Sequence, residues 1–134
     1  MNGLMADTHA LVWYLFQPAR LSSNAMAAMR NAVQAGSIIY ASVMSIIEVR
    51  YLVEKGRLPE VYYEDLVIAA HDPNLPLQFV PIDQDVALAT ERISRDVVPD
   101  MPDRIIAATA LTHNLSLVTA DHKISASKNI TTIW

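Results

Sequence analysis

Four carboxylates are the residues best suited to chemistry in this chain: Asp7, Glu48, Asp103 and Asp121. Each is embedded among apolar or small residues, so a solvated run of charge does not explain them. Hard divalent cations such as Mg²⁺ and Mn²⁺ are held by oxygen ligands. Acidic side chains that are distant in sequence but gathered by the fold would form such a site. The pattern therefore indicates metal-dependent hydrolysis of phosphodiesters.

The elements that must position these carboxylates are strands that alternate with helices. Short apolar runs predict strands at 4–6, 37–41, 77–80, 115–119 and 130–134. Helical spacing, capping residues and terminating glycines or prolines predict helices at 9–16, 22–36, 42–56, 59–69, 83–95 and 103–113. Because the strands are continuous apolar runs, the sheet should be parallel and covered on both faces. We expect one α/β domain over residues 1–134.

The predicted topology places three of the carboxylates at one edge of the sheet. Ligand sites in open parallel sheets lie outside the C-terminal ends of the strands. Asp7 follows the first strand directly, and Asp121 follows the fourth strand. Asp103 lies in the first turn of the helix that leads into the fourth strand. Since helices run antiparallel to the strands, the start of this helix lies at the same edge.

Helix capping is the alternative explanation for the aspartates. Asp7 suits the N-cap of the first helix, Asp100 with Asp103 suits a capping box, and Asp121 suits the cap of a last helical turn. Capping does not apply to Glu48, which lies in the middle of a helix on a mostly apolar face. Burying a carboxylate there without a partner would be unfavourable. A solvated boundary position is the remaining alternative for Glu48.

The neighbouring polar residues have simpler expected roles. We expect Arg104 to form a surface or structural salt bridge, with a phosphate contact as the alternative. Thr8 and Thr119 should pack or cap, although their hydroxyls could orient a carboxylate or a water. The four histidines, His9 among them, lack metal-binding spacing and are expected to be caps or surface residues. Three glycines supply no phosphate-binding loop, and the absence of cysteine excludes thiolate sites and disulfides.

Composition limits the class of protein. With 52% apolar residues in 134, the chain can bury a core and is not disordered. The first residues lack the features of a signal peptide and no apolar run could cross a bilayer, so we expect a soluble cytoplasmic protein. The net charge of −4 argues at first against a nucleic-acid partner. Cations bound by the four carboxylates would cancel it, so net charge does not decide the question.

The chain resembles the PIN-domain family, specifically its toxin-like nucleases of the VapC type. Four segments in order carry the resemblance: Met-Ala-Asp-Thr-His-Ala-Leu-Val-Trp from position 5, Ser-Ile-Ile-Glu from 45, Pro-Asp-Arg-Ile-Ile-Ala-Ala-Thr-Ala from 102, and Leu-Val-Thr-Ala-Asp from 117. Two segments depart from close relatives, at 97–102 and 122–124. These departures leave the acidic residues in place and affect the expected substrate contacts.

The resemblance implies a three-layer α/β/α fold with a central, mostly parallel sheet. It also implies a metal-dependent endoribonuclease that uses Mg²⁺ or Mn²⁺. Asp7, Glu48, Asp103 and Asp121 would be its catalytic and metal-binding acids, and Asp100 would be an additional metal-binding position. An RNA substrate, a cognate antitoxin protein and a homodimer follow as expected partners, because such nucleases are toxins of type II toxin–antitoxin pairs.

Apolar faces on the second to fourth helices are candidates for partner contacts, with core packing as the alternative: Met26, Met29, Tyr62 and Tyr63. Two other functions are possible for such a chain. A phosphoryl-receiver-like module also binds Mg²⁺ on a parallel sheet, but the expected pair of phosphoacceptor Asp and strand-end Lys is missing. A catalytically idle PIN-like module that acts only through protein contacts is the second alternative.

Overall fold

The computed structural model describes residues 1–134 and is built around one five-stranded sheet. The strand order is β3-β2-β1-β4-β5, and every neighbouring pair runs parallel. The strands are β1 (Gly3–Ala6), β2 (Ile38–Ser42), β3 (Leu77–Val80), β4 (Ser116–Val118) and β5 (Thr132–Ile133). The predicted parallel sheet is confirmed, and all five predicted strand segments contribute to it.

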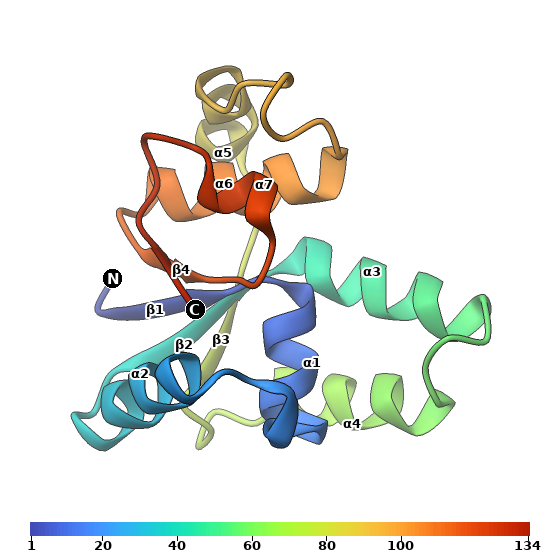
Figure 1. Ribbon diagram of the computed structural model, residues 1–134. Coiled ribbons are helices and arrows are strands. Elements are labelled where there is room, and N and C mark those ends of the chain that lie inside the picture. The colour runs from blue at the N-terminus through green and yellow to red at the C-terminus, as the bar shows by residue number, and fades with distance from the viewer.

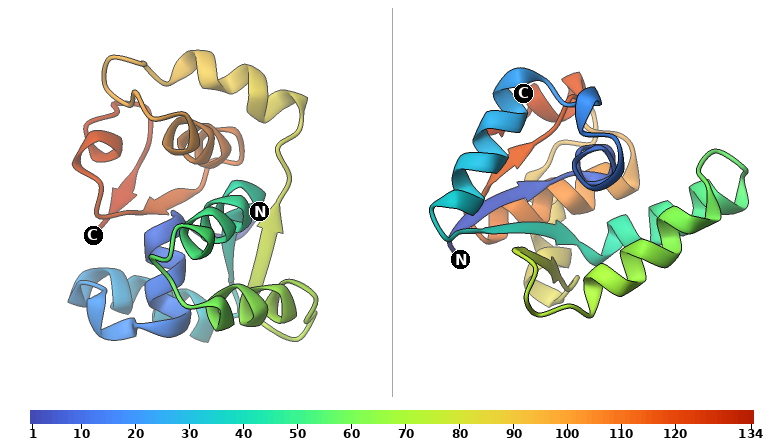
Figure 2. Two further views of the ribbon diagram at one scale, coloured as in Figure 1. Left: turned by 90° about the vertical axis from the view of Figure 1, so that its right-hand side faces the viewer. Right: turned by 90° about the horizontal axis from the view of Figure 1, so that it is seen from below.

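Helices cover both faces of this sheet. They are α1 (Thr8–Phe16), α2 (Ser23–Gln34), α3 (Val43–Glu54), α4 (Glu60–Ala70), α5 (Gln84–Ala89), α6 (Met101–Thr112) and α7 (His122–Ser125), with 3₁₀ turns η1 (Pro18–Arg20) and η2 (Thr90–Arg92). In Figure 1, α5, α6 and α7 lie on one side of the sheet, and α1, α2 and α4 lie on the other. The expected three-layer α/β/α architecture is therefore confirmed. Figure 2 shows that α3 and α4 lie side by side and project beyond the sheet.

The two faces of the central strands contribute side chains to two separate apolar cores. Met5 and Leu117 pack with α5, α6 and α7, whereas the next residues, Ala6 and Val118, pack with α1 and α2. All four are fully buried. Successive side chains of a strand point to opposite faces. A strand covered on both sides therefore needs apolar residues at consecutive positions, which is why the sequence shows runs rather than alternation.

The predicted helix over 83–95 is wrong in its second half. α5 ends at Ala89, and the chain continues through η2 into an irregular connection. The Arg104 guanidinium donates to the backbone oxygens of Thr90 and Ile93 at 2.7–3.2 Å, and the Ile93 side chain is fully buried. These contacts with α6 hold the segment in a 3₁₀ turn and an irregular connection in place of a continued α-helix. Arg104 is structural, as expected, but it bonds to carbonyls and not to a carboxylate.

The apolar side chains considered for partner contacts pack against the core of this chain. Met29 is fully buried, and Met26, Tyr62 and Tyr63 are half-buried against the core on the α1 and α2 side of the sheet. Core packing, the alternative given to these four residues, is what the structure shows.

Among the helices, none combines the length and apolarity that a membrane crossing would require.

Candidate active site

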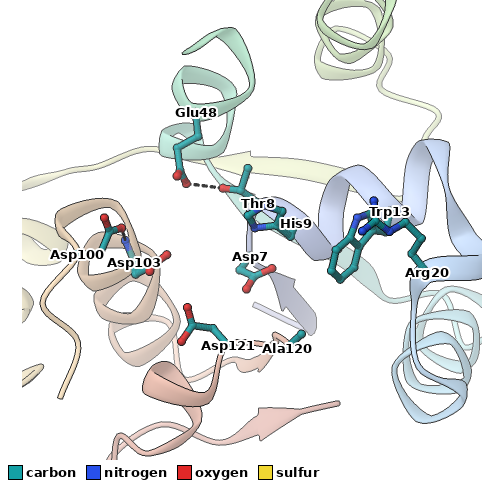
Figure 3. A pocket seen from close by; sticks show the side chains of 10 residues that line it. All are labelled: Asp7, Thr8, His9, Trp13, Arg20, Glu48, Asp100, Asp103, Ala120 and Asp121. Carbon is teal, nitrogen blue, oxygen red and sulfur yellow. Dashed lines mark hydrogen bonds between the residues drawn. The ribbon is translucent and has the colours of Figure 1, made fainter. Parts of the chain in front are cut away.

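A hollow of about 570 Å³ opens at the C-terminal edge of the sheet, and acidic side chains surround it. All five acids expected from the sequence line it: Asp7, Glu48, Asp100, Asp103 and Asp121. Figure 3 shows that they enter from separate elements and surround a common space. Glu48 comes from α3, Asp100 and Asp103 from the start of α6, and the other two from the ends of β1 and β4. The fold therefore gathers carboxylates that are far apart in the chain.

Asp7 is the most buried of these acids, with 7% of its surface exposed. Its Oδ1 accepts a hydrogen bond from the Ala10 backbone N–H at 2.9 Å, so Asp7 is the N-cap of α1. Its Oδ2 accepts a hydrogen bond from the hydroxyl of Thr119. Burial raises the pKa of the Asp7 carboxyl, while the hydrogen bonds from Thr119 and Ala10 oppose that shift. Capping and a place in the hollow are thus combined in one residue.

Thr119 connects two of the acids through a single buried hydroxyl. It donates to Asp7, and its oxygen accepts from the Asp121 backbone N–H at 3.0 Å. Asp121 in turn caps α7, because its Oδ1 accepts from the backbone N–H groups of Lys123 and Ile124. Of the two roles given for Thr119, packing or capping and orienting a carboxylate, the structure shows the second. Its hydroxyl orients a carboxylate 112 positions away in the sequence.

Glu48 is fixed by a second hydroxyl pair. The Thr8 hydroxyl donates to Glu48 Oε1 at 2.6 Å, and Ser45 Oγ lies 2.9 Å from Thr8 Oγ1. Since Thr8 has one hydroxyl proton and it goes to Glu48, Ser45 must donate to Thr8. Burial raises the pKa of Glu48, the hydrogen bond from Thr8 lowers it, and the charge of Asp100 adds to the rise. Glu48 is a half-buried, hydrogen-bonded carboxylate at the boundary between α3 and the hollow.

The start of α6 brings two carboxylates together without such support. Asp100 caps the helix, because its Oδ2 accepts from the Asp103 backbone N–H at 3.2 Å. Burial raises the pKa of Asp103 to about 7, and the negative charges of Asp100 and Asp121 add to the shift. Glu48 and Asp7 act in the same direction. Asp103 therefore lies where negative charge is least compensated.

The donor set suits a hard divalent cation in its chemistry. Its acids supply only oxygen, which is the ligand type that Mg²⁺ and Mn²⁺ prefer. In the arrangement present, no three His, Asp or Glu side chains are close enough together to hold an ion. Mg²⁺ retains several waters and is commonly bound through one or two carboxylates. The residues therefore fit such an ion in kind, with bridging waters or small side-chain movements completing its shell.

Three residues of the hollow were missed as site residues by sequence reasoning: His9, Trp13 and Arg20. The Arg20 guanidinium carbon lies 5.0 Å from the centre of the Trp13 ring, and the His9 ring centre lies 5.7 Å from it. His9 and Trp13 are four positions apart on α1, a spacing that does predict a shared face. Arg20 follows Pro18 in a separate 3₁₀ turn, so no periodicity in the sequence could have found it.

Comparison with known proteins shows the family of the chain and the fold that it shares. The sequence model of the PIN domain family matches residues 4–128. Ribonuclease VapC22 of Mycobacterium tuberculosis is 26% identical over 140 residues, and the alignment covers both chains completely. In a structure of VapBC2 from Rickettsia felis bound to a promoter DNA fragment, one chain is similar with a TM-score of 0.72, 17% identity and 96% coverage of both chains.

A DNA-bound VapBC structure from Salmonella typhimurium gives a TM-score of 0.70 at 18% identity, with 98% of this chain and 97% of that chain covered. At these identities the structural similarity establishes a shared fold. The similarity extends across the hollow, because the matched residues 4–128 contain all five acids.

Proposed function

The chain belongs to the PIN domain family, and from this premise we propose that it is a metal-dependent endoribonuclease that hydrolyses RNA phosphodiester bonds. The observation that carries the proposal is the meeting of Asp7, Glu48, Asp103 and Asp121 in one hollow at the C-terminal edge of a parallel sheet. The full-length similarity to a protein named ribonuclease VapC22 supports the same activity.

We assign Asp7 and Asp103 as ligands of Mg²⁺ or Mn²⁺. Glu48 and Asp121 are further ligands or hold coordinated water, and Asp100 adds negative charge at the rim. A bound divalent cation would polarise the scissile phosphate and make water at the site more acidic. The same charge would offset the repulsion that raises the pKa of Asp103.

The residues of the chain contribute orientation. Thr119 fixes the direction of the Asp7 carboxylate, and Thr8 fixes that of Glu48. An ionised carboxylate accepts a hydrogen bond from water, so Glu48 can align a water for attack on a phosphate held in the hollow. Each carboxylate oxygen retains a second lone pair, which leaves Asp7 able to bind a cation while it accepts from Thr119.

We propose further that this nuclease is the toxin of a type II toxin–antitoxin pair and acts in the cytoplasm. The similar structures from Rickettsia felis and Salmonella typhimurium are VapBC structures, and one from Klebsiella pneumoniae is a toxin–antitoxin complex. The antitoxin is the proposed cognate partner. A cationic residue from it would be complementary to the acidic hollow, and a homodimer is the proposed oligomeric state.

The test is cleavage of single-stranded RNA with Mg²⁺ or Mn²⁺, with a chelator, and with an Asp7→Asn variant. We expect cleavage only by the unaltered protein with metal. Asp83→Asn is a matched control, because Asp83 also caps a helix, accepting from Val86 N–H at 2.9 Å, but lies outside the hollow. Metal binding without RNA turnover would favour the idle PIN-like module. Undiminished cleavage by Asp7→Asn would refute the assigned site.

A further inference from the structure

A second hollow of about 250 Å³ adjoins the acidic one on the side of α1. The two hollows share His9, Trp13 and Arg20, and the second adds Arg57. Figure 3 shows Trp13 and Arg20 on the side of the acidic hollow opposite to Asp100 and Asp103. A continuous surface therefore leads from the carboxylates, over Arg20, to Arg57.

The two arginines of this surface have no acidic partner. Both salt bridges in the chain belong to Arg50, which pairs with Glu54 and Glu60. The Arg104 guanidinium donates its hydrogen bonds to backbone carbonyls. Arg20 and Arg57 are exposed, and neither takes part in a salt bridge. Many cations of the chain lack an acidic partner, but Arg20 lines the acidic hollow and Arg57 the one that adjoins it, so these two are placed to meet a negatively charged ligand there.

Arg20 is oriented by two contacts within the chain. Its guanidinium carbon lies 5.0 Å from the centre of the Trp13 ring, and its Nη1 donates to Gln17 Oε1 at 3.3 Å. Trp13 is itself held, with its ring centre 5.7 Å from those of His9 and Trp134. A guanidinium stacked on an aromatic face keeps outward N–H groups for a phosphate. Preorganisation of this kind reduces the entropy lost on binding.

We propose that Arg20 and Arg57 hold the phosphate backbone of single-stranded RNA beside the acidic hollow, and that Trp13 is a positioning residue for Arg20. This proposal rests on the ribonuclease function proposed above. Carboxylates repel RNA until metal is bound, so a strand that enters the hollow needs cations alongside its path. The guanidinium fork matches phosphate oxygens in two-point hydrogen bonds. The flanking nucleotides of the substrate would therefore lie along α1 and not along α6.

The test measures binding of a short fluorescein-labelled single-stranded RNA of mixed sequence across a range of KCl concentrations, with Mg²⁺ present. The parent for this titration is Asp7→Asn, which we expect not to cleave the RNA. We expect Arg20→Gln and Arg57→Gln each to weaken binding by about 3- to 10-fold. Each should also reduce the slope of log K against log salt by about 0.7, the value for one phosphate contact in a single strand. Arg30→Gln is the matched control, because Arg30 is an exposed arginine that lines a separate hollow with Tyr14.

Trp13 is tested through its dependence on Arg20. Trp13→Leu should weaken RNA binding as Arg20→Gln does, whereas Trp13→Phe retains a ring and most of the affinity. In the Arg20→Gln background, Trp13→Leu should add little, which a merely structural role for Trp13 would not produce. Thermal unfolding of each variant shows whether it is folded. If Trp13→Leu does not fold, Trp13→Phe in both backgrounds supplies the comparison.

Unchanged affinity and salt slope in both arginine variants would overturn the proposal. Cleavage by the unaltered protein would then still stand, so this result is separate from a failure of the proposed function. A second outcome would also overturn the proposal: the arginine substitutions leave the salt dependence of RNA binding unchanged but weaken binding of a glutamate-rich peptide. That result would assign the surface to a protein partner. The proposal is supported if the slope of log K against log salt falls in Arg20→Gln and Arg57→Gln but not in Arg30→Gln.

Discussion

The two sides of the acidic hollow are built in different ways. On the side of β1 and α3, Asp7 and Glu48 each accept a hydrogen bond from a buried threonine hydroxyl. At the start of α6, Asp103 faces only burial and like charge, which raise its pKa to about 7. The first side has its geometry fixed in the metal-free protein. On the second side the carboxylates repel one another. A bound cation should therefore change the protonation of Asp103, and the stability of the fold, mainly through this side.

The largest effect should come from replacing Asp7, the buried acid on the first side, and a much smaller one from replacing Asp100 on the second side. We expect Asp7→Asn to lower RNA cleavage by about 1,000-fold, because several kcal/mol of charge stabilisation are lost. Asp100→Asn should lower it by less than about 10-fold, since Asp100 is an exposed cap at the rim. Single-turnover cleavage rates measure both. Equal losses in the two variants would remove the distinction between the sides.

Addition of Mg²⁺ tests the second side directly. We expect it to raise the unfolding free energy of the metal-free protein by about 2–3 kcal/mol at a hundredfold excess over Kd. The gain should be smaller in Asp103→Asn, because that variant lacks the carboxylate that most needs a neighbouring cation. Thermal unfolding with and without chelator measures the change. An unfolding temperature independent of Mg²⁺ would contradict the proposed cation site.

The hydroxyl of Thr119 tests the first side. Thr119→Val leaves Oδ2 of the buried Asp7 without a donor, while Oδ1 keeps its bond from the Ala10 N–H, and should lower the unfolding free energy by about 1–3 kcal/mol. Cleavage should fall by about 10- to 100-fold, as for residues that orient a metal ligand. Denaturant unfolding and cleavage assays measure the two effects. Thr109→Val is the matched control, because Thr109 is equally buried but donates to the Ile105 carbonyl within α6.

The smallest effect is the pH dependence that Asp103 contributes. Its pKa rises from 3.8 when unfolded to about 7 when folded, so between these values the folded state holds a proton that the unfolded state releases. The unfolding free energy of the metal-free protein should therefore fall as pH rises from about 4 to 7, by about 1–2 kcal/mol after solvent screening. Denaturant titrations across this range measure it. Asp103→Asn should flatten the profile, and a profile unchanged by that substitution would contradict the charge coupling.

The sequence alone determined the order of strands and helices along the chain and the edge at which three of the acids lie, Asp7, Asp103 and Asp121. Apolar runs, caps and terminators act within a few residues of each other, so they can be read without knowledge of the fold. Asp7, Asp100 and Asp121 illustrate this, because each caps the helix that follows it and also lines the hollow. Parallel topology then brings the ends of distant strands to one edge. Capping and site residues thus coincide, and the two explanations for the aspartates were not exclusive.

Tertiary structure alone decided which side chains meet inside that edge. The bond from Thr119 to Asp7 depends on β4 pairing with β1, and the bond from Thr8 to Glu48 depends on how α3 is rotated against α1. The early end of α5 and the stacking of Arg20 on Trp13 likewise come from contacts between separate elements. Local patterns fix backbone conformation, but hydrogen bonds between distant residues depend on strand order and helix rotation, which no local pattern specifies.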